Sequence, residues 1–340
     1  MSICLGYDDS EARDGSGAQL QKVIGIYGMS KKFKTGFFFT GFNQIEPNPG
    51  DGVNSEETYK ELLREINSTF SFEGKKCHRD HIVSKIQYTR LFRWDITTKI
   101  WFLVQKMKCL IKKNHILLLI DSPYYFVERD PSLYLEYVKD FPSTKAFSKS
   151  VEIQIHILGA KNTNVMMSER FIPIDWYISN LLVILDELSK LELPYKITIH
   201  TDAPRKSTSW NPIIPISKAT LEYWKKGGLV NQDGQIILNE LDVEETFAEF
   251  RNVTVVRDVS PVVAWQIMSN ADIFLGAKSS FSIIGAILST PSLSIFNKLQ
   301  HNLPLDWEVV ESANTINPSR VGDFLNNSSS IRTLIVDSKN

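Results

Sequence analysis

Residues 271–290 read ADIFLGAKSSFSIIGAILST. The first seven, ADIFLGA, are typical of a buried strand, and SIIGAILS (282–289) is an apolar run typical of a buried helix. The polar residues at the junction are Lys278, Ser279, Ser280 and Ser282, with Phe281 among them. Helix N-termini at the carboxyl ends of parallel strands favour anions, so the junction predicts a site for a negatively charged ligand. The alternative is that a serine simply caps the helix.

The same alternation of strand-like and helical runs extends over the chain. The runs that predict strands are 35–42, 115–121, 151–158, 195–202 and 253–258, and those that predict helices are 22–33, 54–70, 99–113, 174–191 and 261–270. Strands that alternate with helices indicate parallel sheets covered on both faces. We therefore expect an α/β protein with two doubly wound, Rossmann-like domains, residues 1–148 and 149–340, that face a cleft.

Composition limits the classes of function. The chain has 340 residues and a formal net charge of −1, so no global positive field favours nucleic acid or an anionic membrane. An anion must instead be held by a local arrangement. The N-terminus has no signal-peptide pattern and no apolar run is long enough to span a membrane, which leads us to expect a soluble, cytoplasmic protein.

The cysteines predict no disulfide framework. Three of them, Cys4, Cys77 and Cys109, fit a reducing compartment. The segment CHRDH (77–81) has residue types that bind zinc, but no second ligand pair stands at zinc spacing, so a metal site is disfavoured.

Other segments place polar groups where a ligand of an α/β sheet would lie. One predicted strand ends around His156, and another ends in Thr201 and Asp202. Near the N-terminus, DGSGAQLQ (14–21) precedes the first predicted helix, and its spaced glycines allow close backbone approach. Neither GxxxxGK[ST] nor GxGxxG occurs, so ATPase and dinucleotide-binding interpretations lack their fingerprints.

The ordered set of these features resembles the fucosyltransferase-like superfamily of inverting, metal-independent GT-B glycosyltransferases. The matching residues, spread over about 14–290, are Gly15, Gly17 and Gln19, with Ser16 in the same loop; His156 and Ile157; Arg170, Phe171, Pro173 and Tyr177; Thr201 and Asp202; and Ser280, Phe281 and Ser282. The resemblance implies a nucleotide-sugar donor held by the second domain and a glycan acceptor held by the first. No metal or other cofactor is expected, and no DxD motif occurs.

One departure from the family pattern concerns the charge at the donor site. Leu158 stands where the family has an arginine that neutralises the leaving diphosphate, and an aliphatic side chain cannot do this. Lys278, Lys161 and Arg257 are candidate replacements. The donor is then of the GDP-fucose type or another, such as UDP-xylose or GDP-rhamnose. Two rival interpretations stay open: a catalytically inactive glycan-binding protein of the same fold, and another enzyme such as a sugar-nucleotide epimerase.

An inverting transfer needs a group that takes the proton of the acceptor hydroxyl. Asp14 directly precedes the glycine turn and is the first candidate, although aspartate in Asp-Gly more often only forms a turn. His156, Asp8 and Asp9 are the alternatives.

Overall fold

The computed structural model describes most of the chain. The described residues are 2–8, 15–46, 53–70, 72, 77, 82–86, 96–112, 114–120, 130, 132–141, 145, 148–159, 171–210, 218–226, 228–238, 240–298, 303, 306–329, 331 and 334. They fall into two compact units: unit 1 comprises Met1–Glu46, Tyr59–Pro142 and His301–Pro304, and unit 2 comprises Pro47–Thr58, Ser143–Gln300 and Leu305–Asn340.

Unit 1 is built on a four-stranded sheet in which every neighbouring pair is parallel. The strands, in the spatial order β2-β1-β4-β3, are β2 (Gly36–Phe38), β1 (Ile3–Tyr7), β4 (Ile116–Ile120) and β3 (Ile82–Ile86). The helices are α1 (Ser16–Lys32), the greater part of α2 (Glu56–Thr69), α3 (Ile96–Lys112) and α5 (Ser132–Asp140). The sequence patterns did not reveal β1, and α1 begins at Ser16 rather than near Lys22.

Unit 2 contains a six-stranded parallel sheet in the order β12-β11-β10-β5-β6-β9. Its strands are β5 (Val151–Ile157), β6 (Tyr195–Thr201), β9 (Val253–Val256), β10 (Ile273–Gly276), β11 (Leu293–Asn297) and β12 (Glu308–Val310). The helices are α6 (Ile174–Lys190), α7 (Lys218–Lys226), α8 (Val243–Thr246), α9 (Pro261–Met268), α10 (Ser280–Leu288) and α11 (Pro318–Asn327), and β7 (Thr208–Trp210) and β8 (Ile236–Leu238) form a separate antiparallel pair.

The strand order of unit 2 decides where a ligand would bind. Numbered along the chain, the six strands follow the doubly wound order 3-2-1-4-5-6, and the winding direction reverses between β5 and β10. Ligands of open α/β sheets bind outside the carboxyl ends of the strands at such a reversal. The two parallel sheets confirm the predicted α/β class with two Rossmann-like units.

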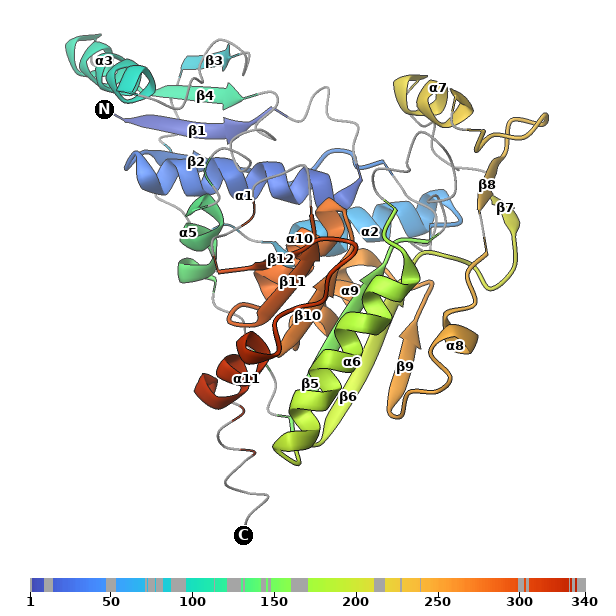
Figure 1. Ribbon diagram of the computed structural model, residues 1–340. Helices are drawn as coiled ribbons and strands as arrows, with labels where there is room; N and C mark the ends of the chain where they lie inside the picture. Colours follow the sequence, from blue (N-terminus) through green and yellow to red (C-terminus); the bar gives the residue numbers. More distant parts are fainter. Residues whose placement is uncertain are drawn as a thin grey trace. The chain divides into compact units, whose positions relative to one another are not determined.

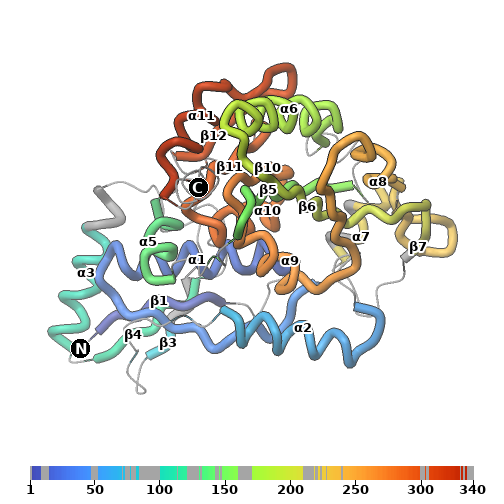
Figure 2. Tube along the Cα trace, turned by 90° about the horizontal axis from the view of Figure 1, so that it is seen from below, coloured from blue at the N-terminus to red at the C-terminus, as the bar shows by residue number. Residues whose placement is uncertain are grey.

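The two faces of the unit 2 sheet are covered differently. On one face, Ile153, Ile155 and Leu275 join an apolar core with α6 and α11, which lie together in Figures 1 and 2. The other face carries α9 and α10, and there Gln154, His156, Thr198 and His200 are buried although they are polar. Because side chains alternate along a strand, the residues between the core isoleucines of β5 and β6 all belong to this second face.

A disulfide joins Cys4, on β1, to Cys77. The expectation that the cysteines form no disulfide is therefore wrong, and the support that it lent to a reducing compartment is removed. The pairing also removes Cys77 as a thiolate ligand in CHRDH; residues 78–81 lie outside the described residues. Cys109 is a buried free thiol.

We predict that unit 1 depends on this disulfide. It closes a loop with a sequence separation of 73 residues. In the chain-entropy description, a loop of that length contributes about 4 kcal/mol to the free energy of unfolding. Urea unfolding should show the same loss for Cys77→Ser and for the reduced wild-type protein, whereas reductant should leave Cys77→Ser unchanged. Equal stability of the oxidised wild type and the variant would contradict the prediction.

Candidate functional site

The hydroxyl of Ser282 contacts both central strands of unit 2, at the carboxyl ends of β10 and β5. It is fully buried in the first turn of α10, and it accepts a hydrogen bond from the Ala277 N–H at 2.9 Å. The same oxygen lies 2.5 Å from Nδ1 of His156, near the carboxyl end of β5. Sequence reasoning placed both side chains in the ligand site. The structure brings the two side chains together. The Ser282 hydroxyl points into the protein and not to solvent, so its role is to hold the β10–α10 turn in place.

The residues just before Ser282 have the exposure that a ligand contact requires. Ser279 is the N-cap of α10, and its hydroxyl accepts from the Ser282 N–H at 3.2 Å. Lys278, Ser280 and Phe281 are half-buried, as is Ser279. Ser279 therefore caps the helix, and the segment around it is accessible at the switch point of the sheet, where the ligand site is predicted.

An aromatic pair supports the junction from α9. The ring of Phe281 stacks on Trp265 at a centroid distance of 4.8 Å and lies 5.1 Å from the imidazole of His156. The indole N–H of Trp265 also donates to the Phe281 carbonyl. These contacts hold the first turn of α10 in place, and sequence periodicity gave no signal for the role of Trp265.

Burial keeps the two histidines of the polar face neutral. It lowers the pKa of His156 from 6.5 to about 4. Burial, together with the neighbouring charge of His156, lowers the pKa of His200 to about 3. His200 donates from Nε2 to Gln154 Oε1 at 2.7 Å, while its buried Nδ1 has no hydrogen-bond partner in the described part of the chain. At neutral pH neither imidazole supplies a positive charge to an anion.

The predicted residue Asp202 joins the ends of β5 and β6, and its neighbour Thr201 shapes the turn after β6. The Gly159 N–H donates to Asp202 Oδ1 at 2.8 Å, and the Ala203 N–H donates to Thr201 Oγ1 at 3.1 Å. A Cβ atom at Gly159 would come within 2.4 Å of the Ala203 side chain, so the two strand ends approach closely only because residue 159 is glycine. Both polar residues lie at the carboxyl edge of the sheet, as predicted, and both are engaged in bonds that shape it.

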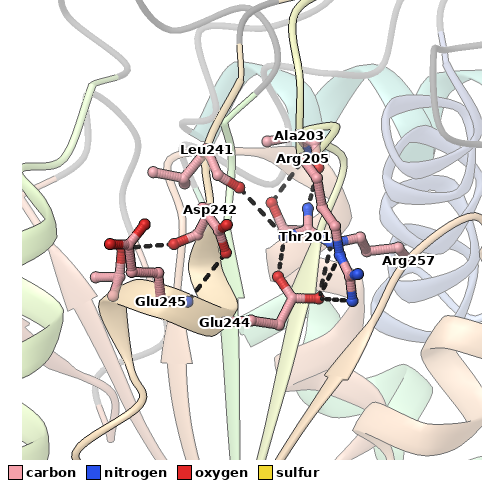
Figure 3. A network of polar contacts seen from close by, with 9 residues as sticks. Thr201, Ala203, Arg205, Leu241, Asp242, Glu244, Glu245 and Arg257 are labelled. Atoms are coloured by element: carbon pink, nitrogen blue, oxygen red, sulfur yellow. Dashed lines mark hydrogen bonds and ion pairs between the residues drawn. The ribbon is translucent and has the colours of Figure 1, made fainter.

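Arg257 belongs to a different group of contacts, shown in Figure 3. Its guanidinium binds Glu244 Oε2 at 2.6 Å and donates to the carbonyls of Ala203 and Leu241. Arg205 binds the other carboxylate oxygen of Glu244 at 2.8 Å. The hydrogen bond from Arg257 is the main reason why the pKa of Glu244 falls from 4.5 to about 2. Arg257 follows β9, two strands from β5, so the structure does not bring it to the Lys278 segment.

In unit 1 the predicted loop lies at the start of α1. Gly15 is the N-cap and offers no side-chain cap, and Ser16 and Gly17 are buried in the first turn. Gln19 is fully buried and its Oε1 accepts from the Tyr7 hydroxyl at 2.6 Å. Ser16 Oγ and Gln19 Nε2 are buried without a hydrogen-bond partner among the described residues. Two unpaired buried polar atoms at a helix N-terminus are unusual and point to a polar ligand there.

The start of α1 also lies at a strand-order reversal. In the unit 1 sheet β1 separates β2 from β4, and the Asp8 N–H at the end of β1 donates to the Ile120 carbonyl at the end of β4. Asp8, a candidate base, is therefore described at this edge. The other candidates Asp14 and Asp9, and also Lys161 and Arg170, lie outside the described residues.

The remaining residues of the family pattern have structural positions in unit 2. Pro173 is the N-cap of α6, Tyr177 is buried in the apolar core, and Phe171 is exposed. Ile157 is buried in the same core, and Leu158 is half-buried just beyond β5.

Comparison with known proteins gives distant structural likenesses only. No family model and no curated protein matches the sequence. The E. coli ADP-heptose LPS heptosyltransferase II has 9% identity over 100% of both chains, with a TM-score of 0.34. E. coli heptosyltransferase WaaC with ADP-2-deoxy-2-fluoro heptose has 10% identity over 96% of this chain and 99% of that chain, with a TM-score of 0.38. POFUT1 in complex with GDP-fucose has 9% identity over 84% and 94%, with a TM-score of 0.36.

Likenesses at these TM-scores transfer neither a ligand nor an activity to this chain. Its fold class follows from its own strand orders, and its candidate site follows from its own residues.

We predict that the buried histidines make folding stability depend on pH. Both folded-state pKa values lie below 6.5, so between pH 6.5 and about 4 the unfolded chain binds more protons than the folded one. The free energy of unfolding should therefore fall as the pH is lowered through this window, measured by urea unfolding. His200→Gln keeps a nitrogen near Gln154 but cannot titrate, and it should flatten the slope. An unchanged slope would assign the pH dependence to other groups.

Proposed function

We propose that this chain is an inverting glycosyltransferase that moves a sugar from a nucleotide-diphosphate donor to a glycan hydroxyl. The observation that carries the proposal is the convergence of Lys278, the Ser279-capped start of α10, and the polar ends of β5 and β6 at the switch point of a doubly wound sheet. This arrangement suits a phosphorylated ligand, because backbone N–H groups, hydroxyls and one cation lie at the same edge.

The donor site is assigned to unit 2. Lys278, Ser279, Ser280 and Phe281 are the accessible residues of the junction, and they would meet the diphosphate. Ser282 and His156 act as positioning residues, because their buried contact holds the turn. Asp202 holds the end of β6 against the end of β5, and Thr201 holds the turn that follows β6.

The cation that would replace the family's arginine is Lys278. His156 is neutral, and Arg257 is held by Glu244 and two carbonyl groups. Lys161 is the remaining candidate of the sequence. A GDP-fucose-type donor, UDP-xylose or another nucleotide sugar is compatible with this site, since no residue described in unit 2 selects the base or the sugar by itself.

The acceptor side and the base are assigned to unit 1. The unpaired Ser16 hydroxyl and Gln19 amide at the start of α1 favour a polar ligand such as a sugar hydroxyl or phosphate. Asp14, directly before this loop, is the proposed base. Metal independence also stays a prediction, and transfer that is abolished by EDTA and restored by Mn²⁺ would refute it.

The first test is nucleotide binding. Lys278→Ala removes a charge-assisted contact, which contributes about 1.5–3 kcal/mol, so affinity for GDP or UDP should fall by about one to two decades. Calorimetric titration would measure this, with Lys226→Ala on α7 as the matched lysine control. If wild type binds neither nucleotide, or Lys278→Ala binds as tightly as wild type, the donor site is not at this junction.

The second test concerns the base. Asp14→Asn should keep donor affinity near wild type and lower the rate of sugar transfer by about 10²–10⁴, because the amide cannot accept the hydroxyl proton. Single-turnover transfer to a glycan acceptor is the measurement. A rate within a few-fold of wild type would assign the base to another group, and Asp8→Asn is the variant to compare.

A second candidate is a catalytically inactive glycan-binding protein of the same fold. Leu158 at the arginine position and the engagement of Arg257 with Glu244 favour it, because both reduce the positive charge available to a leaving diphosphate. Thermal shifts distinguish the two. Stabilisation by a nucleoside diphosphate supports the transferase, and stabilisation by oligosaccharides alone supports the binding protein.

A further inference from the structure

Helix α3 of unit 1 exposes an apolar stripe from Ile100 to Ile111. The residues of the stripe are Ile100, Leu103, Val104, Met107, Leu110 and Ile111, and the exposed fraction of each lies between 40% and 77%. They recur at spacings of three and four residues. At about 100° per residue they cover roughly 120° of the helix circumference. Large contiguous apolar surfaces of this kind mark an interaction site.

The opposite face of α3 is the one that packs on unit 1. Phe102 stacks on Phe33, which follows α1, at 4.4 Å, and Cys109 is buried. The Lys106 ammonium donates to the Phe33 carbonyl at 2.8 Å. Figures 1 and 2 show α3 beside the start of β1. The helix is therefore anchored through its inner face, and the stripe is not needed for that packing.

Charge on α3 has one sign. The helix contains four lysines and no acidic residue, although the whole chain has a net charge of −1. Lys108 and Lys112 are exposed, and helical spacing puts them on one side of the stripe, with the half-buried Trp101 on the same side about two turns before Lys108. An apolar stripe bordered by lysines and an indole is complementary to an anionic lipid surface.

The same composition fits a protein partner less well. Lysine is depleted in protein–protein interfaces, which favour arginine, whereas the cations that border this stripe are all lysines. Lysine stems can lie along the apolar border while their ammonium groups reach lipid phosphates. No helix among the described residues is long and apolar enough to cross a bilayer, so α3 would lie in the plane of the surface.

We infer that α3 is a membrane-binding helix that docks unit 1 onto an anionic lipid surface. The inference is independent of the proposed sugar transfer, because it uses none of the donor-site residues. The apolar stripe enters the boundary between headgroups and acyl chains, and the lysines bind the anionic headgroups.

Vesicle flotation tests this inference with the full chain. Wild type should float with vesicles of phosphatidylcholine and phosphatidylserine but only weakly with phosphatidylcholine alone, and high salt should reduce flotation. Met107→Gln with Ile111→Gln should lower the partition coefficient at least about tenfold, and Lys108→Gln with Lys112→Gln should lower it on anionic vesicles only. The exposed Leu182→Gln on α6 and Lys226→Gln on α7 are matched controls and should float like wild type.

The results of these experiments distinguish a lipid surface from a protein partner that binds the apolar stripe. All four altered residues are exposed, so the variants should keep the wild-type unfolding midpoint. The inference is overturned if wild type does not float, or if the Met107→Gln, Ile111→Gln variant floats like wild type. It is also overturned if light scattering shows a dimer that this variant dissociates, because the stripe is then a subunit interface.

Discussion

The buried hydroxyl of Ser282 is the contact on which the candidate site depends. By joining the Ala277 N–H to the imidazole of His156, it fixes how the chain leaves β10 and enters α10, directly beside the end of β5. The chain is closely packed on both sides of this contact: a Cβ atom at Gly276 would lie 2.2 Å from the ring of Phe296, and one at Gly285 would lie 2.6 Å from Met268 Sδ. The accessible segment from Lys278 to Phe281 therefore has a defined position at the strand-order reversal.

Fewer positive charges are available at this edge of unit 2 than the number of its histidine and arginine residues suggests. His156 and His200 are held neutral by burial, and Arg257 is balanced by Glu244. A cation contributes to anion binding only where it is near the anion and not already neutralised by a carboxylate. At the junction itself, the groups that favour an anion are the N-terminal dipole of α10 and the half-buried Lys278 side chain. A diphosphate would be held by few contacts, and each of them should have a measurable effect.

Unit 1 has two features that lie outside the proposed donor site. At the start of α1, two polar atoms are buried without a hydrogen-bond partner among the described residues, which a folded protein tolerates when a ligand or water supplies the missing bonds. On α3, apolar side chains remain exposed although the helix is already anchored through Phe102. The first feature concerns a small polar ligand and the second an extended surface. They use different residues, so mutations can separate them.

The sequence by itself determined the α/β class and the central strands β5, β6 and β10 of unit 2, because hydrophobic periodicity is a local property of each segment. It also located the β10–α10 junction, His156 and the ends of β5 and β6. It missed β1, a five-residue strand followed directly by a run of polar residues, and it also missed β3, β11 and β12. It missed the Cys4–Cys77 disulfide as well, whose partners are 73 residues apart. Only the tertiary structure decided that Ser282 faces inward, that Arg257 binds Glu244, and that the stripe on α3 is exposed. These outcomes depend on which distant segments meet in space, and a sequence pattern carries no information about the partner on the other side of a contact.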